Sequence, residues 1–229
     1  MGHEWRVVLD EPRPAAEQMA IDERLAREPR LTVRLFEWAA PAVSLGWKQA
    51  APAWLVASEL ETVERPTGGG LAFHGSDVSV AVLVPRELPL PVSVLMASLC
   101  GSAAALVQTY GGQPRQVLTP PSTARRITYC LAEESPYAVM AGDRKLAGFA
   151  IRRYPRTWLL QGSLLVSPMP EPIVCALPEA VAASLNRRAV SLSAAAGHIL
   201  APADARRRWA AHWSSWWDAA LLEMAVHAV

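Results

Sequence analysis

Residues 65–74 hold the densest group of side chains that could do chemistry, reading Arg-Pro-Thr-Gly-Gly-Gly-Leu-Ala-Phe-His. Three consecutive glycines weaken helices and strands alike, because each glycine has the largest backbone entropy to lose. They suit a loop whose backbone approaches a ligand closely, and successive N–H groups in such a loop can hold an anion. A flexible surface turn is the ordinary alternative, but Arg65 before the glycines and His74 after them favour a ligand site.

Two further side chains are candidates for reactive roles. Lys145 is bracketed by Gly142 and Gly148, so a ligand can approach it, and an apolar segment follows at once. A lysine in a turn is usually only a solvated charge, and a free cysteine is usually a small buried hydrophobe. Cys130 becomes a nucleophile only where it is accessible and a nearby cation favours its thiolate. Lys145, or the arginines at 125–126, could supply that cation.

Other common catalytic patterns are missing from the sequence. It has no closely spaced cysteine and histidine set for zinc, so we expect no metal site. It has neither a Gly-x-Ser-x-Gly elbow nor a Walker phosphate loop. The cysteines, three in number, are too few and too widely spaced for a disulfide framework. A reduced, cytoplasmic setting fits this usage best.

The composition is that of a globular chain with a substantial core. Of the 229 residues, 52% are hydrophobic and 19% are charged, and the formal net charge is +1. This balance gives no sign of a nucleic-acid surface or an anionic-membrane anchor. We expect no apolar run of the length that crosses a bilayer, and the N-terminus does not resemble a signal peptide.

The first half of the chain is expected to alternate short strands and helices. Strands are predicted over 5–9 and 31–38, and a helix over 15–27. A further short apolar segment covers 42–45. Valines at 78, 80, 82 and 84 follow period two, which is typical of a strand with one buried face. We expect this strand to form a hairpin with residues 70–74, turning at 75–77. Helical spacing of apolar residues predicts a helix over 95–110.

The second half continues in the same way. Residues 111–128 are expected to form a surface loop, and strands over 137–140 and 146–151 to form a hairpin. A strand over 158–166 is expected to be interrupted at its glycine, and four prolines argue against regular helix in 167–178. The final helix, predicted over 204–224, carries a tryptophan stripe that we assign to core packing. No linker composition appears, so one domain is expected.

Several segments, in order, resemble the motifs of the biotin/lipoyl protein ligase superfamily, in its lipoate branch. They are Gln18-Met19-Ala20-Ile21-Asp22-Glu23, Leu45-Gly46-Trp47-Lys48-Gln49, the segment 65–74, Gly142-Asp143-Arg144-Lys145-Leu146-Ala147-Gly148 and Gln161-Gly162-Ser163-Leu164-Leu165. The resemblance covers most of the chain. It implies an α+β fold with mixed β-sheets flanked by helices. It also implies one catalytic domain over residues 1–229, without the separate C-terminal accessory domain of many ligases.

The resemblance implies transfer of an octanoyl or lipoyl group to the lysine of a lipoyl carrier domain. Such carriers are of the 2-oxoacid dehydrogenase E2 or glycine cleavage H protein type. In this picture Lys145 polarises the acyl carbonyl or the leaving group, stabilising negative charge. Arg65 faces the activated carboxyl end, and the glycines lie against the acyl chain. The implied substrate-binding set is Arg65, Thr67, Gly68, Gly69, Gly70, His74 and Gly148.

Two mechanisms occur on this scaffold. A lipoate-protein ligase uses ATP and magnesium to form lipoyl-adenylate, whereas a cysteine-dependent octanoyltransferase takes octanoate from acyl carrier protein through an enzyme thioester and needs no cofactor. Tyr129-Cys130-Leu131-Ala132-Glu133-Glu134-Ser135-Pro136-Tyr137 resembles the nucleophile segment of the transferases, with Cys130 at the nucleophile position. We therefore favour the transferase, with Cys130 and Lys145 as its catalytic residues.

Departures from the transferase pattern keep alternatives open. Leu131 stands in place of an aromatic residue, Gly70 in place of a frequent arginine, Phe149-Ala150-Ile151 in place of Ser-Ala-Gln, and Gln161 in place of a histidine. The ATP-dependent ligase remains the main alternative. A non-catalytic relative that binds acylated carriers is a lesser one, because a binding module needs neither Cys130 nor Lys145. A biotin ligase ranks lowest because its signature differs from residues 65–70.

Overall fold

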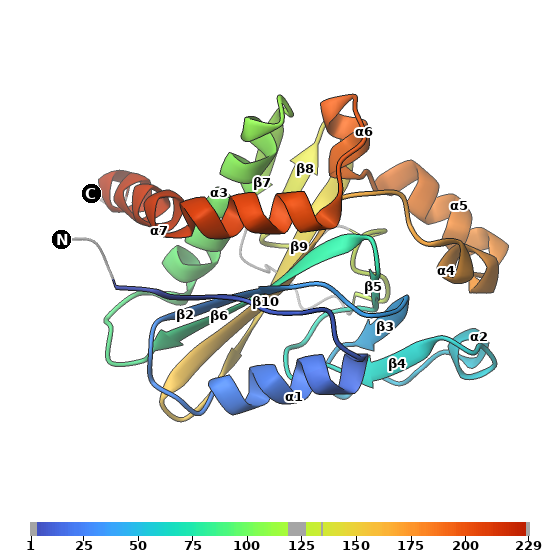
Figure 1. The fold of residues 1–229 in the computed structure, drawn as a ribbon, viewed down its shortest axis with the longest axis horizontal. Coiled ribbons are helices and arrows are strands. Elements are labelled where there is room, and N and C mark those ends of the chain that lie inside the picture. The colour runs from blue at the N-terminus through green and yellow to red at the C-terminus, as the bar shows by residue number, and fades with distance from the viewer. Residues whose placement is uncertain (1–3, 119–126, 134, 228–229) are drawn as a thin grey trace.

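The computed structural model describes residues 4–118, 127–133 and 135–227, and it contains two sheets with helices packed around them (Figure 1). The larger sheet has the strand order β1-β2-β6-β10-β9-β8-β7 and the smaller has the order β4-β3-β5. In the larger sheet β1 and β2 run parallel and the other neighbours run antiparallel. The predicted α+β class, with mixed sheets flanked by helices, is confirmed.

The strands and helices have the following bounds. The larger sheet comprises β1 (Arg6–Leu9), β2 (Thr32–Phe36), β6 (Asp77–Pro85), β7 (Pro114–Val117), β8 (Ala138–Ala141), β9 (Arg144–Arg153) and β10 (Thr157–Leu165). The smaller comprises β3 (Ala42–Leu45), β4 (Glu61–Glu64) and β5 (Ala72–His74). The helices are α1 (Ala15–Leu25), α2 (Ala53–Val56), α3 (Val92–Thr109), α4 (Glu171–Ala176), α5 (Glu179–Arg188), α6 (Leu192–Ala196) and α7 (Pro202–His227).

The predicted hairpin between residues 70–74 and the valine-rich strand is wrong. β5 pairs with β3 in the small sheet, while β6 pairs with β2 on one side and β10 on the other. With both edges of β6 occupied, β5 has no edge to join, so the segment between them passes from one sheet to the other. The expectation that β6 has a single buried face is also wrong. Its valines face α3 and α7, and its other face packs under α1.

Three local expectations also differ from the structure. β7 forms within the segment expected to be loop, because it pairs with β8 at the sheet edge. Short helix α4 forms in the proline-rich segment, where Pro172 falls in the first turn, a position that needs no N–H donor. β10 is continuous through Gly162, where an added Cβ would lie 2.0 Å from the Phe149 ring. That glycine makes room for the ring and does not break the strand.

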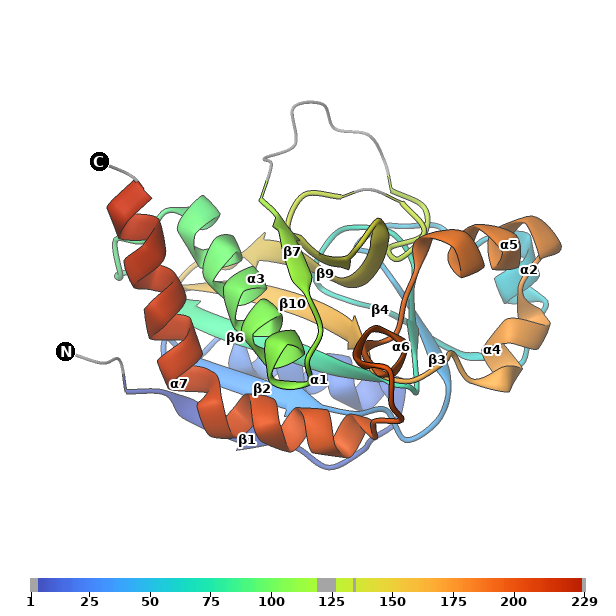
Figure 2. The same ribbon diagram turned by 90° about the horizontal axis from the view of Figure 1, so that it is seen from above.

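Helices α3 and α7 lie side by side on one face of the larger sheet (Figure 2). With 18 mostly apolar residues, α3 could cross a membrane by length and composition, so the expectation that no such run exists is wrong. Here the helix is mostly buried against α7 and the sheet, as core helices are. The predicted tryptophan stripe consists of Trp209, Trp213, Trp216 and Ala220, and the full burial of Trp209 and Trp213 confirms its assignment to the core. Trp217 is also fully buried, whereas Trp216 is only partly buried, and the side chain of Ala220 is not described.

Candidate functional site

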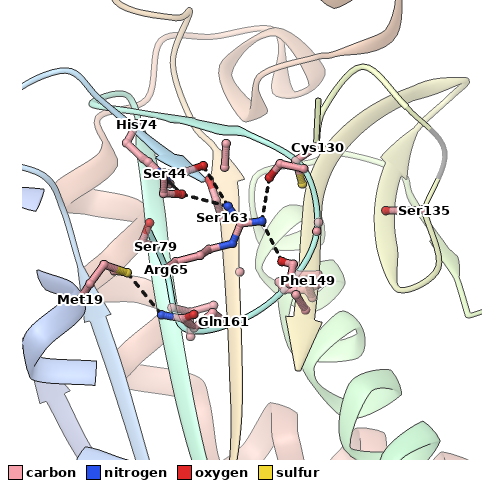
Figure 3. Close-up of a pocket in the computed structure, with 18 of the residues that line it drawn as sticks. Met19, Ser44, Arg65, His74, Ser79, Cys130, Ser135, Phe149, Gln161 and Ser163 are labelled. Carbon is pink, nitrogen blue, oxygen red and sulfur yellow. Dashed lines mark hydrogen bonds between the residues drawn. The ribbon is translucent and has the colours of Figure 1, made fainter. Parts of the chain in front are cut away.

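A cavity opens between the larger and the smaller sheet, on the face that α1 covers (Figure 3). It holds about 600 Å³ of space between atoms, part of it open to solvent. Its apolar wall includes Met19, Phe36, Trp38, Val80 and Phe149. The apolar lining suits an aliphatic chain.

The cavity brings together most of the residues singled out from the sequence. Arg65, Gly68, Gly69, Gly70, His74, Cys130 and Gly148 all line it. Thr67 and Lys145 do not line the cavity, but each forms a hydrogen bond to a residue that does. The arginines at 125–126, considered as partners for Cys130, lie outside the described residues.

The glycine loop is packed too closely to accept side chains at two of its positions. A Cβ at Gly70 would lie 2.7 Å from the backbone of Thr128, and Gly69 has a φ of +99°. The neighbouring loop fits just as tightly, because a Cβ at Gly46 would lie 2.1 Å from the carbonyl oxygen of Gly69. A Cβ at Gly68 would meet nothing within 4 Å. Three backbone segments therefore meet here at contact distance and form the rim of the cavity.

The buried side chain of Arg65 stabilises this rim through hydrogen bonds. Its Nη1 donates to the backbone oxygen and the hydroxyl of Ser44, at 3.0 and 3.2 Å, and its Nη2 donates to the carbonyls of Gly68 and Gly70, at 2.8 and 2.7 Å. The side chain is buried, and no carboxylate lies within ion-pair distance among the described residues. Burial lowers the pKa of Arg65, while the nearby Cys130 thiol raises it. Arg65 thus contributes an unneutralised positive charge to the cavity wall.

Cys130 is fixed against the signature segment by backbone hydrogen bonds. Its N–H donates to the Leu71 carbonyl at 2.8 Å, and the Leu71 N–H donates to the Thr128 carbonyl at 2.7 Å. The thiol is partly exposed and faces Gly148, where an added Cβ would lie 2.9 Å from its sulfur. The sequence carries two other cysteines, Cys100 and Cys175, and neither lines the cavity.

Those two cysteines differ from Cys130 in their surroundings. Cys100 is buried in α3, and burial raises the pKa of its thiol well above the usual range. Cys175 is exposed on α4. Only Cys130 therefore combines access from the cavity with nearby positive charge.

Lys145 projects from β9 to the other side of the same glycine. Its Cε and Nζ would lie 3.1 and 3.3 Å from a Cβ at Gly148, the position that the Cys130 sulfur also approaches. Nζ donates to the carbonyls of Cys130 and Glu133, at 2.6 and 3.2 Å, and to the hydroxyl of Ser135. Lys145 is 2% exposed, and its ammonium contacts no carboxylate among the described residues. Its charge is therefore available to an anion beside Gly148.

His74 is held at both ring nitrogens. Nδ1 lies 2.9 Å from a carboxylate oxygen of Asp77, Nε2 lies 2.8 Å from the hydroxyl of Ser44, and the ring stacks on Trp38 at 4.0 Å. Burial alone would raise the pKa of Asp77, but the charge and hydrogen bond of His74, with hydroxyl donors from Ser163 and Ser79, lower it overall. The ring thus shapes the wall of the cavity.

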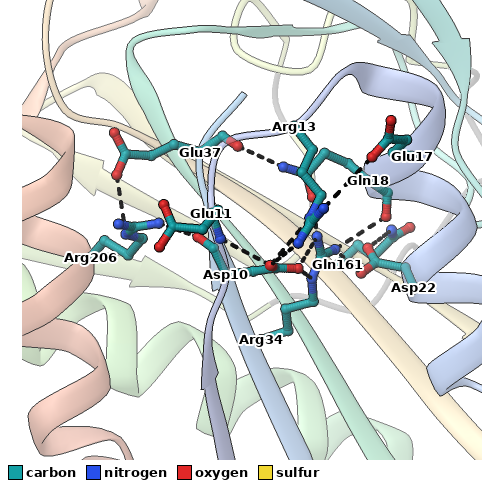
Figure 4. A network of polar contacts seen from close by, with 10 residues as sticks. All are labelled: Asp10, Glu11, Arg13, Glu17, Gln18, Asp22, Arg34, Glu37, Gln161 and Arg206. Carbon is teal, nitrogen blue, oxygen red and sulfur yellow. Dashed lines mark hydrogen bonds and ion pairs between the residues drawn. The ribbon is translucent and has the colours of Figure 1, made fainter. Parts of the chain in front are cut away.

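Thr67 is connected to helix α1 through Gln161 of β10. The Thr67 N–H and hydroxyl donate to Gln161 Oε1, at 3.3 and 2.7 Å, and Gln161 Nε2 donates to Asp22 at 2.7 Å. Asp22 in turn forms a 2.6 Å ion pair with Arg34, which is completely buried under α1 (Figure 4). A chain of contacts thus runs from α1 to the glycine loop.

Sequence reasoning did not assign roles to Ser44, Asp77 or Ser135. Ser44 and Asp77 hold His74, and their types gave no signal, because serines and aspartates are common in turns and at strand ends. Ser135 did carry a signal, since it falls within the segment that resembles the transferase nucleophile motif.

Comparison with known proteins agrees with the motifs. The lipoyl protein ligase A/B catalytic domain family matches residues 14–214. The octanoyltransferase LipM of Symbiobacterium thermophilum is 31% identical, over 90% of this chain and 84% of its own. The octanoyltransferase LipM of Kyrpidia tusciae is 29% identical, over 89% of this chain and 82% of its own.

Solved structures share the fold. A lipoate-protein ligase A bound with ATP superposes with a TM-score of 0.71 at 16% identity, covering 96% of this chain and 94% of its own. A bipartite lipoate protein ligase from Thermoplasma acidophilum, described with its E2 lipoyl domain, gives a TM-score of 0.70 at 14% identity, covering 97% and 92%. At identities this low, the similarity establishes the shared fold alone, and the chemistry has to be inferred from the residues of the site.

Proposed function

This chain belongs to the lipoyl protein ligase A/B catalytic domain family, and on that premise we propose that it transfers an octanoyl group from acyl carrier protein to a lysine of a lipoyl carrier domain. The observation that carries the proposal is the meeting of the Cys130 sulfur and the Lys145 ammonium at Gly148, beside an apolar cavity. The curated octanoyltransferases that this chain resembles support the same reaction.

The first step acylates the enzyme. The Cys130 thiolate attacks the carbonyl carbon of the donor thioester, the new carbon–sulfur bond forms, and the carrier thiolate leaves and takes up a proton. Lys145 and Arg65 favour the attacking thiolate because both are buried cations without a carboxylate partner among the described residues. Lys145 also lies close to the place where negative charge develops on the carbonyl oxygen. All its N–H groups are engaged, so a direct hydrogen bond to that oxygen requires it to release Ser135.

The second step returns the thiol. The neutral amine of the acceptor lysine attacks the Cys130 thioester, the amide bond forms, and the sulfur leaves as a thiolate while the amine loses its proton. The thioester is already activated, so this route uses no nucleotide. ATP and magnesium belong to the alternative, a ligase that forms an acyl-adenylate. Because the thiol must stay reduced, we place the reaction in the cytoplasm.

Intact-mass spectrometry tests the proposal. Incubation with octanoyl-acyl carrier protein should add one octanoyl group to the enzyme, removable by hydroxylamine. The adduct should be absent from Cys130→Ser and present in Cys175→Ser, the matched control with an exposed cysteine. A lipoyl domain added next should become octanoylated.

A parallel reaction contains lipoate, ATP, magnesium and the lipoyl domain. If the domain is modified only in that mixture, and Cys130→Ser is as active as the unaltered protein, the protein is a ligase. If neither mixture modifies the domain, it is a non-catalytic relative.

A further inference from the structure

A second cavity adjoins the first on the far side of the catalytic pair. It holds about 640 Å³ of space between atoms, part of it open to solvent, and is lined by Lys145 and Ser135, among others. Ser135 lines both cavities, so they border each other at this residue, with Cys130 on the wall of the first and Lys145 on the wall of the second. Figure 3 shows Ser135 apart from the other labelled side chains, beyond Cys130 as seen from Arg65.

The second cavity differs from the first in its charge. Arg115 from β7 and Arg188 from the end of α5 line it together with Lys145, against the carboxylates of Glu133 and Asp143. Neither arginine forms an ion pair with another described residue. Glu133 is already engaged, since it accepts hydrogen bonds from the N–H groups of residues 128 and 129, both at 2.8 Å. The cavity thus offers two guanidinium groups that no carboxylate of the described residues pairs with.

The remaining lining is apolar. Its members are Val117, Leu131, Ala132, Ala138 and Met140. A ligand that fits this cavity is therefore a slender chain of mixed character that ends in an anion.

We propose that the second cavity binds the phosphopantetheine arm of the donor carrier, with Arg115 and Arg188 holding its phosphodiester. This proposal rests on the octanoyl transfer proposed above. In a thioester the acyl chain and the thiol substituent leave the carbonyl carbon in different directions. If the acyl chain fills the first cavity and the carbonyl lies at Cys130, the thiol substituent is directed to the second.

The acceptor lysine is the other occupant to consider. Among the described residues of the lining, its ammonium group would approach three cations against two carboxylates, one of which is already hydrogen-bonded. Arginine guanidinium groups instead match the geometry of a phosphate. Charge thus favours the donor arm over the acceptor side chain.

Donors that differ only in the phosphate isolate the proposed contact. Octanoyl-phosphopantetheine and octanoyl-pantetheine carry the same thioester, and acylation of Cys130 by each is followed by intact mass. For the unaltered protein we expect kcat/KM to be about tenfold or more higher with the phosphorylated donor, as charge-assisted hydrogen bonds allow. Arg115→Ala and Arg188→Ala should each lower this ratio several-fold, and the double variant should bring it close to one.

Arg144→Ala is the matched control, because Arg144 is an exposed arginine beside the same cavity that does not line it. It should leave the ratio as it is. A ratio near one in the unaltered protein overturns the assignment of the cavity. So does an equal loss with both donors in the arginine variants, which would show a purely structural role. Absence of Cys130 acylation from every donor, with modification dependent on ATP and lipoate, overturns the octanoyl-transfer function as well.

Discussion

The Cys130 sulfur and the Lys145 side chain both approach Gly148 so closely that a side chain at this position would collide with them. The two residues are 15 positions apart in the sequence, and the Lys145 ammonium also holds the Cys130 carbonyl. Motif resemblance predicted both residues and the glycine beside them. It could not show that the lysine is anchored by carbonyl and hydroxyl groups, because those contacts depend on how residues 128–137 fold against β9.

We expect Gly148→Ala to slow Cys130 acylation about a hundredfold, since a displacement of about 1 Å between reacting groups can cost that much. The added methyl group would lie 2.9 Å from the sulfur and 3.1 Å from Cε of Lys145. Single-turnover acylation with octanoyl-acyl carrier protein measures the effect. Urea unfolding provides the control, because overpacking alone should cost only about 1–3 kcal/mol of stability. A rate within a few-fold of the unaltered enzyme would contradict this account of the site.

The supporting elements of the site lie far apart in the sequence. The Thr67–Gln161 contact joins residues 94 positions apart, and Gln161–Asp22 joins residues 139 apart. Period and propensity predicted most of the strands and helices, and the short apolar segment noted over 42–45 is strand β3. They failed for the partners of β5 and for β7, because strand pairing is decided by which sheet edges remain free. The roles of Ser44 and Asp77 were not predicted either, because their contacts with His74 form only once the strands of the two sheets are in place.

The chain of contacts from α1 to the glycine loop can be tested by exchanging its polar groups. In Asp22→Asn an amide would face the amide of Gln161, so one hydrogen bond must break or Gln161 must turn its NH₂ toward Thr67. We expect this variant to lose about 1–3 kcal/mol of stability, as an unsatisfied buried group does, and to acylate Cys130 more slowly. Gln161→Glu should also be impaired, because two carboxylates would then be buried together.

The double variant Asp22→Asn with Gln161→Glu restores the pattern with the same total charge. The amide introduced at position 22 would accept from Arg34 and donate to the carboxylate introduced at position 161. That carboxylate would in turn accept from Thr67. Recovery of both urea stability and single-turnover rate is the expected result. Additive losses in the double variant would show that the contacts do not act as one chain.

At the scale of the whole molecule, Asp77 joins the two sheets. It begins β6, binds His74 of β5, and accepts the hydroxyl of Ser163 on β10 at 2.7 Å. Because its pKa is lowered in the folded protein, its ionised form stabilises the fold above the unfolded value of about 4. This contribution is lost as the pH falls through the lower folded pKa.

Urea unfolding of the unaltered protein and Asp77→Asn should reveal that loss. At pH 7 we expect the variant to be less stable by on the order of 3 kcal/mol, as when a buried ionic partner is removed. Below about pH 4 the difference between the two proteins should shrink. A difference that stays constant between about pH 7 and about pH 3 would show that the carboxylate charge contributes little.

The two cavities border each other at Ser135, and this arrangement limits the order in which the two carriers react. Once an acyl chain occupies the apolar cavity, it blocks approach to its thioester from that cavity. Donor and acceptor must both reach the carbonyl carbon at Cys130, so the discharged donor carrier has to depart before the acceptor lysine arrives. Initial rates measured while both substrates are varied should therefore give parallel double-reciprocal lines. The acceptor should compete with the donor for the free enzyme, and the donor should compete with the acceptor for the acylated enzyme.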